Sequence, residues 1–180
     1  VLELFKEISD IVKDHNLGDI YGFNSIAGNC CLSAGGVHWI GFLIDILKKL
    51  ELYKNISKSE ILGNITISNN NPRAQYLNML SGSLNFKLEN FNFNLIYNKS
   101  SHMAPIQSII CKYGKIDFGI TGWYQVYKCN NIRKLCMPHQ YSELKIVKKG
   151  NFECVNDDPF KKCLLNSLNG TGVHIYDGIN

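Results

Sequence analysis

The chain has 180 residues, of which 45% are hydrophobic, and a formal net charge of +4. This is the composition of a globular protein with enough apolar side chains for a packed core. The positive charge is spread along the sequence, without a basic run or interleaved aromatic residues, so we expect no nucleic-acid partner. No run of about 18 apolar residues, the length needed to cross a bilayer, occurs in the sequence.

Cysteines and glycosylation triplets both indicate an extracellular protein. The chain has seven cysteines, and because this number is odd, at least one thiol stays free or pairs outside the chain. Four Asn-x-Ser/Thr triplets are typical of glycosylated surface proteins. They begin at Asn55, Asn64, Asn98 and Asn169. The sequence therefore predicts a location at the cell surface, on the extracellular side.

The first part of the chain, residues 1–61, predicts a small βα segment. Apolar residues recur at helical spacing over residues 2–12, and Gly18 follows where such a helix ends. A short strand is expected at residues 20–23. The most strongly periodic helix of the sequence is expected at residues 39–50.

The next part, residues 62–150, predicts a second α/β unit. Ile65 and Ile67 alternate with polar residues as in a strand, and a helix is expected over residues 76–84. Apolar residues then alternate over residues 86–97, which predicts one or two strands joined near Glu89.

Residues 105–149 predict a helix followed by two strands. Pro105 suits a first helical turn, isoleucines follow at helical spacing, and Gly114 stands where the helix would stop. Apolar residues alternate with polar or small ones over residues 115–121, which predicts a strand that ends beside glycines. A second strand is expected at residues 144–147. Residues 151–180 form an irregular tail in this interpretation.

One stretch of this region resembles a known family. The segments IDFGI at 116–120 and IVKK at 146–149, with Pro138 between them, are similar to a lobe of the clamshell of bacterial solute-binding proteins and ionotropic glutamate-type receptors. The receptor branch, in its divergent arthropod type, is the most similar. The resemblance implies an α/β fold with a periplasmic-binding-protein-like lobe of type 2 at 62–150. Residues 151–180 would then be a linker toward the membrane.

The resemblance also implies a function. The chain would be the ligand-sensing fragment of a ligand-gated cation channel, whose two lobes close around a small molecule. Its partners would be a second lobe and a pore domain of the same receptor, within a homo- or hetero-oligomer. No cofactor is implied, and a binding protein is favoured over an enzyme.

The ligand would be held by the loop after the first strand, because open α/β sheets bind ligands at strand carboxyl ends. By resemblance, Gly122, Tyr124 and Cys129 stand where the receptors have a proline, a threonine and a carboxylate-binding arginine. A thiol cannot form the bidentate pair of a guanidinium with a carboxylate, so glutamate is not the expected ligand. Thr121 and Lys128 complete the predicted site, and its aromatic residues suit an uncharged or cationic ligand.

Two enzyme alternatives remain open. Gly-Asn-Cys before a helix resembles papain-like and ovarian-tumour-type cysteine hydrolases, with Cys30 as nucleophile and His38 or His174 as base. The strand Gly-x-x-Asp-x-Gly-Ile-Thr-Gly at 114–122 resembles one in ATP phosphoribosyltransferase, although no phosphate-binding glycine loop is present.

A metal site is not predicted. Four residues could be drawn together as ligands, but their spacing matches no zinc module. They are Cys129, Cys136, His139 and Cys154.

Overall fold

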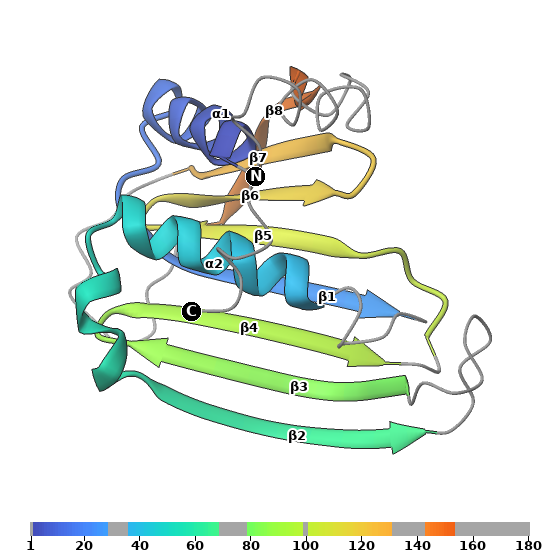
Figure 1. Ribbon diagram of the computed structural model, residues 1–180. Helices are drawn as coiled ribbons and strands as arrows, with labels where there is room; N and C mark the ends of the chain where they lie inside the picture. Colours follow the sequence, from blue (N-terminus) through green and yellow to red (C-terminus); the bar gives the residue numbers. More distant parts are fainter. Residues whose placement is uncertain (1, 29–35, 69–78, 99–100, 131–142, 154–180) are drawn as a thin grey trace, which may run out of the picture.

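A computed structural model describes residues 2–28, 36–68, 79–98, 101–130 and 143–153. Its centre is an eight-stranded sheet with the strand order β2-β3-β4-β1-β5-β6-β7-β8 (Figure 1). The helical elements are α1 (Leu2–Asp14), α2 (Val37–Lys49) and the short 3-10 helix η2 (Tyr53–Lys58). The strands are β1 (Ile20–Gly28), β2 (Glu60–Ser68), β3 (Met79–Leu88), β4 (Phe91–Asn98), β5 (Ile106–Cys111), β6 (Gly114–Gly119), β7 (Trp123–Cys129) and β8 (Leu144–Asn151).

The sheet is mostly antiparallel. β1 and β4 are parallel neighbours, and every other neighbouring pair of this sheet is antiparallel. The expected α/β class is confirmed, but the expected periplasmic-binding-protein-like lobe is wrong. The predicted boundary at residue 61 falls within one sheet, because β1 lies between β4 and β5. The segments 1–61 and 62–150 therefore share this sheet.

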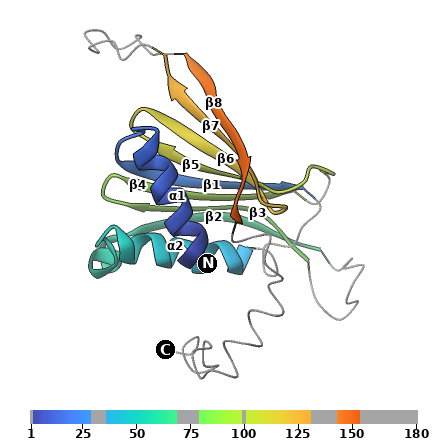
Figure 2. The same ribbon diagram turned by 90° about the horizontal axis from the view of Figure 1, so that it is seen from above.

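Both long helices lie on the same side of the sheet (Figure 2). The strands explain this arrangement, since alternate side chains along a strand point to opposite faces. In β4 the side chains of Phe91, Phe93, Leu95 and Tyr97 are buried, whereas those between them are half-buried or exposed. Apolar residues of α1 and α2 cover this face. The opposite face, which we call the open face, carries no helix among the described residues.

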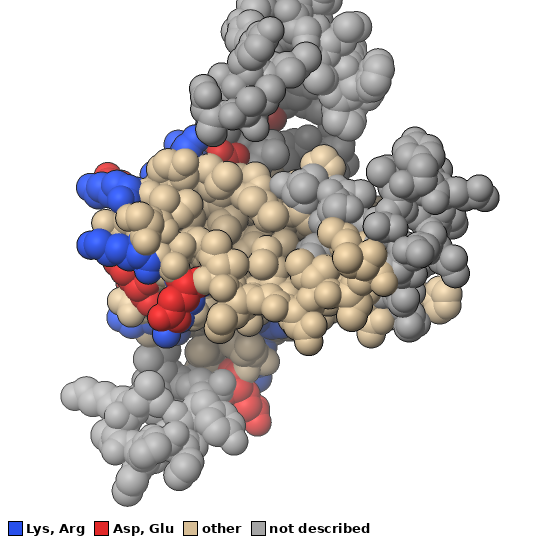
Figure 3. All heavy atoms as spheres, turned by 60° about the horizontal axis from the view of Figure 1, so that its bottom comes forward, with Lys and Arg blue, Asp and Glu red and all other residues tan. Residues whose placement is uncertain are grey.

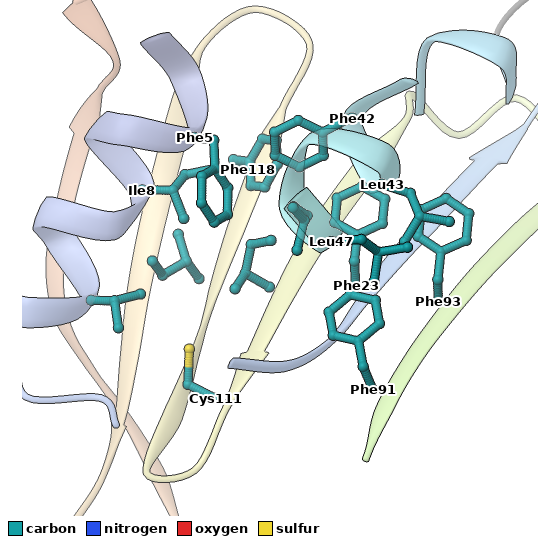
Figure 4. Packing of buried hydrophobic residues seen from close by; sticks show 14 of the residues in the cluster. Phe5, Ile8, Phe23, Phe42, Leu43, Leu47, Phe91, Phe93, Cys111 and Phe118 are labelled. Carbon is teal, nitrogen blue, oxygen red and sulfur yellow. The ribbon is translucent and has the colours of Figure 1, made fainter. Parts of the chain in front are cut away.

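Aromatic rings join α2 to the middle of the sheet (Figure 4). Phe23 of β1 stacks on Phe93 of β4 with their ring centroids 5.2 Å apart. Phe42 of α2 meets the same Phe23 ring edge-on at 5.3 Å. Because β1 is the central strand of this packing, the position of α2 over the sheet is set by the Phe23 side chain.

Two predicted helices are strands. Residues 106–111 form β5, and residues 79–88 form β3, so the helices expected at 105–114 and 76–84 are wrong. In β5 the buried residues alternate with half-buried ones, which is the period of a strand. β-Branched isoleucines also favour a strand, and β5 has a neighbour on each side to bury them.

The other expected elements are confirmed. The helices near 2–12 and 39–50 are α1 and α2, and the expected strands correspond to β1, β2, β6 and β8, although β6 ends at Gly119, two residues before the expected end at 121. Residues 86–97 form parts of two antiparallel strands, as anticipated. Their connection is tight, with Glu89 at a positive φ of 52°.

Candidate functional site

The predicted ligand loop is a turn followed by a strand. The amide of Gly122 donates a hydrogen bond to the carbonyl of Gly119, and Gly122 has a φ of +90°. β7 then begins at Trp123 and lies between β6 and β8. The loop expected after the first strand is therefore limited to the turn that ends at Gly122, and the residues from Trp123 to Cys129 form a strand.

The five predicted ligand residues do not come together. Tyr124 is buried in the core, where its ring lies 4.8 Å from that of Phe152. Thr121 and Gly122 precede β7, whereas Lys128 and Cys129 lie at its far end. Since a strand rises about 3.3 Å per residue, these two ends are about 20 Å apart. One small molecule cannot contact both ends.

Other predicted residues are scattered or lie outside the described part of the chain. Asn55 donates a hydrogen bond of 2.8 Å to Glu89, while Asn64 and Asn98 are exposed on β2 and β4. Their glycosylation stays a prediction. Residues that lie outside the described ranges are Cys30, Cys136, Pro138, His139, Cys154, Asn169 and His174. Within the described ranges, no three His, Cys, Asp or Glu side chains come together as metal ligands.

The parallel pair β1 and β4 indicates a different position for a site. In open α/β sheets, ligands bind beyond the carboxyl ends of parallel strands. β1 and β4 end side by side, with Gly28 paired to Asn98. α2 starts over β1 and runs back along the strand (Figures 1 and 2). His38 is exposed in the first turn of α2.

Gly28 closes the end of β1 against a neighbouring segment. Its amide donates a hydrogen bond of 2.9 Å to the carbonyl of Met103. A Cβ atom added at Gly28 would lie 2.4 Å from the carbonyl oxygen of Ser101. Because no side chain fits there, the backbone of residues 101–103 can approach β1 directly.

A buried polar pair lies on the core face of the sheet, the face that carries Phe23. Ser25 of β1 and Gln107 of β5 are register partners, and both are completely buried. The Gln107 amide nitrogen is 3.4 Å from the Ser25 hydroxyl, a long hydrogen bond, and the Gln107 side-chain oxygen has no partner in the structure. Such a group costs about 1–3 kcal/mol and calls for an explanation.

Trp39 covers the surroundings of this pair. Its ring lies 5.7 Å from Phe23, which precedes Ser25 on the same face of β1. It also lies 6.2 Å from Phe118, the register partner of Gln107 on β6. The polar pair is therefore enclosed by aromatic rings, and the protein offers it few alternative hydrogen-bond partners.

The first turn of α2 has few hydrogen-bond partners for its backbone amides. Its N-cap residue is Gly36, no side chain of the described residues caps the helix, and the turn holds no acidic residue. Free amide groups and the positive end of the helix dipole favour a polar or anionic group at such a position. We call the set of Ser25, Gln107, His38 and the first turn of α2 the β1-end site.

The open face carries a second polar arrangement. Register places one residue of each strand in a single line across the sheet. In strand order these are Leu62, Asn85, Asn94, Asn24, Ser108, Asp117, Gln125 and Lys149. We call this line the polar row.

Several members of the polar row bond to one another or to a neighbouring row. Asn94 donates a hydrogen bond of 2.7 Å to Asn24. Asp117 accepts hydrogen bonds of 2.6 Å from Ser108 and 2.7 Å from Lys115. The side chains of the polar row thus form many of their hydrogen bonds with one another. The β1-end site, in contrast, contains a buried oxygen that has no hydrogen-bond partner. This difference favours the β1-end site as the place for a ligand.

No protein-family model and no curated protein matches the chain. Several solved structures are similar to the chain. The Bacillus subtilis protein yvaA, named as an oxidoreductase, is similar with a TM-score of 0.52 and 10% identity, over 93% of this chain and 53% of that chain. The dehydrogenase MviM from Clostridium difficile has a TM-score of 0.47 and 13% identity, over 91% of this chain and 50% of that one.

These structures are oxidoreductases of the Gfo/Idh/MocA family. A third, the UDP-N-acetylglucosamine 3-dehydrogenase GnnA from Acidithiobacillus ferrooxidans, has a TM-score of 0.43 and 9% identity, over 89% of this chain and 50% of that chain. The chain thus spans about half the length of the structures it matches. At these identities the likeness is one of fold.

The comparisons overturn the receptor interpretation. The fold is similar to that of yvaA and is not a periplasmic-binding-protein lobe, so the ionotropic-receptor identity, the ion-channel function and the pore-domain partner are wrong. The hydrolase and phosphoribosyltransferase alternatives are overturned by the same likeness. No helix within the described ranges is long and apolar enough to span a bilayer. The resemblance failed because IDFGI and IVKK lie on β6 and β8, two strands of an antiparallel meander with β7 between them.

Sequence analysis missed Ser25 and Gln107. A signal exists for Gln107, because it is a polar residue at an inward position of β5, two residues before the buried Ile109. This sequence signal can be recognised only if residues 106–111 are taken as a strand. With helical spacing, Gln107 lies on a different face from the apolar residues of the segment.

Proposed function

We propose that the chain is the sheet domain of an oxidoreductase and that it binds the substrate at the β1-end site. The observation that supports this proposal is the fold shared with yvaA, with a TM-score of 0.52 over 93% of this chain. The position of the site agrees with the general preference for strand carboxyl ends.

The residues of this chain do not fit a dinucleotide cofactor. Dinucleotide-binding sheets are parallel and carry a Gly-x-Gly-x-x-Gly turn before a helix. The sequence holds no such motif, and one pair of strands in the described sheet is parallel. We therefore assign the cofactor to a separate domain of the same polypeptide, and assign no hydride step to this chain.

The groups of the β1-end site suit a substrate that bears a hydroxyl or carbonyl oxygen. The unsatisfied oxygen of Gln107 can accept a hydrogen bond from a hydroxyl group, and Ser25 can donate or accept one. The amides of the first turn of α2 can donate to an oxygen that carries partial negative charge. Because Ser25 and Gln107 are completely buried, the Trp39 ring must move aside before a substrate oxygen can reach them.

His38 is the proton-transfer group in this proposal. Oxidation of a hydroxyl group releases a proton, and an imidazole within hydrogen-bond reach can accept it. His38 is the titratable side chain of the first turn of α2, and it is exposed. An exposed imidazole can also pass the proton on to water.

The test uses the complete polypeptide that carries this chain, assayed for hydride transfer with nicotinamide cofactors and a panel of hydroxylated substrates. His38→Gln is expected to lower kcat by about 10²- to 10⁴-fold, the usual contribution of a general base. His15→Gln is the matched control, because His15 precedes the amino end of β1, about 30 Å from Gly28 along the strand. Unchanged kcat in His38→Gln, or an equal loss in His15→Gln, contradicts the assignment.

A further inference from the structure

The two edges of the sheet are built differently. β8, at one edge, carries the exposed lysines Lys145, Lys148 and Lys149. Its register with β7 also shifts between Val126 and Tyr127, which marks a β-bulge or irregularity. Lysines and bulges are the devices by which proteins prevent an edge strand from pairing with another chain.

β2, at the opposite edge, lacks these devices. All nine of its residues pair with β3 without a register shift, and Glu60 is its one charged residue. Its large apolar side chains are strongly exposed. The exposed fractions are 63% for Ile61, 70% for Leu62, 46% for Ile65 and 66% for Ile67. Such a strand is a ready template for pairing.

Much of the surface around β2 is also uncharged. Seen from this side of the molecule, charged residues gather at one end and leave a broad uncharged area (Figure 3). No described strand pairs with the outer side of β2. An apolar edge of this length differs from the scattered apolar residues of an ordinary surface.

We propose that β2 pairs antiparallel with β2 of a second copy of this chain, across a two-fold axis, and joins the two sheets into one. The sequence of β2 is self-complementary in this arrangement. With the axis at Asn64, all nine residues find a partner. Ile61 lies opposite Ile67 of the second copy, and Leu62 lies opposite Thr66. Glu60 lies opposite Ser68, so no like charges meet.

The pairing extends the helix-covered face across the axis. Ile61 is the register partner of the buried Phe86, so Ile61, Ile65 and Ile67 project on the same face as the core. In the dimer these side chains gain the isoleucines of the second copy as neighbours. The axis leaves no room for a glycan on Asn64, because the two Asn64 side chains face each other.

The first test is the oligomeric state by analytical ultracentrifugation over a range of concentrations. The full chain is expected to dimerise, and Ile65→Lys is expected to raise the dimer dissociation constant by at least about tenfold, since it places two like charges beside the axis. Ile146→Lys on β8 is the matched control, because Ile65 and Ile146 are each 46% exposed. It is expected to leave the dimer intact.

The second test is a disulfide cross-link that reports the register. In Asn64→Cys the two cysteines face each other with Cβ atoms about 5 Å apart, close enough for a disulfide after small adjustment. In Leu62→Cys each cysteine faces Thr66 of the second copy, and the two are separated by about 13 Å along the strands. Asn64→Cys is therefore expected to cross-link under mild oxidation far beyond the wild-type background, and Leu62→Cys is not.

Either test can overturn the proposal. A chain that stays monomeric at every concentration assigns the edge to a strand of a different molecule and excludes self-pairing. Equal dissociation by Ile65→Lys and Ile146→Lys places the interface elsewhere. Equal cross-linking of Asn64→Cys and Leu62→Cys contradicts the stated register. None of these outcomes depends on oxidoreductase activity, because β2 lies at the sheet edge and contributes no residue to the β1-end site.

Discussion

The buried side chain of Gln107 makes a prediction about stability. Its oxygen has no partner, so the folded state bears a desolvation cost that an apolar side chain of similar length avoids. Gln107→Met is expected to raise the free energy of unfolding by about 1 kcal/mol, measured by urea denaturation. The same variant is expected to raise KM in the hydride-transfer assay, because the substrate oxygen loses a contact.

The control for Gln107 lies on the open face. Gln125 accepts a hydrogen bond of 2.7 Å from Tyr127 and is half-buried, so Gln125→Met is expected to change stability by no more than about 0.5 kcal/mol. A clear loss of stability in Gln107→Met would show that the amide is fully bonded in the folded protein. In that case the β1-end site would lose the observation that distinguishes it from the polar row.

Cys111 makes a prediction about pH. Burial raises the pKa of its thiol from 9.0 to about 12. Because the folded pKa lies above the unfolded one, the stability from the neutral thiol is present below pH 9 and is lost as the pH rises toward about 12. Cys111→Ala is therefore expected to lower stability but to flatten the fall in the free energy of unfolding over this interval. An identical slope in the two proteins would contradict the assignment.

At the scale of elements, Phe23 connects helix and sheet. Its ring lies 5.2 Å from Phe93 and 5.3 Å from Phe42, so truncation opens a cavity between α2 and the strands. Phe23→Ala is expected to cost about 3–5 kcal/mol in chemical denaturation. Tyr21→Ala in the same strand, at an exposed position, is expected to cost less than about 1 kcal/mol. Similar costs for both variants would contradict the described packing of α2.

The two long helices could be predicted because their signal is local. Apolar residues at 3.6-residue spacing define α1 and α2 without reference to the rest of the chain. β3 was mistaken for a helix because Leu80 and Leu84 lie four residues apart, a spacing that suits one face of a helix and also one face of a strand. The serines and glycine between them are poor helix formers. The strand is stabilised by β2 and β4, which pair with β3 on its two sides.

At the scale of the whole molecule, the β1-end site could not be predicted because it is assembled by register. Ser25 and Gln107 are 82 residues apart in sequence, and they meet because β5 pairs with β1. His38 was singled out from the sequence, but as a base for Cys30, which lies outside the described ranges. Neither local periodicity nor a short resemblance contains the strand order that brings these residues to one end of the sheet.

The parallel pair β1 and β4 organises the molecule for its proposed function. It places two strand carboxyl ends together, and the chain between β1 and β4 supplies α2, which covers the core side of the sheet. The β2 edge lies beyond β3 and β4, away from this end of β1. Substrate binding and self-association are therefore assigned to different parts of one sheet.

The most direct test of the central claim is a titration with nicotinamide dinucleotides, followed by fluorescence or calorimetry. It compares this 180-residue chain with the complete polypeptide that carries it. A sheet domain of an oxidoreductase predicts saturable binding to the complete polypeptide and none to this chain at the same concentrations. Saturable binding to this chain with equal affinity would contradict the assignment of the cofactor to a separate domain. Absence of binding to the complete polypeptide would contradict the oxidoreductase function itself.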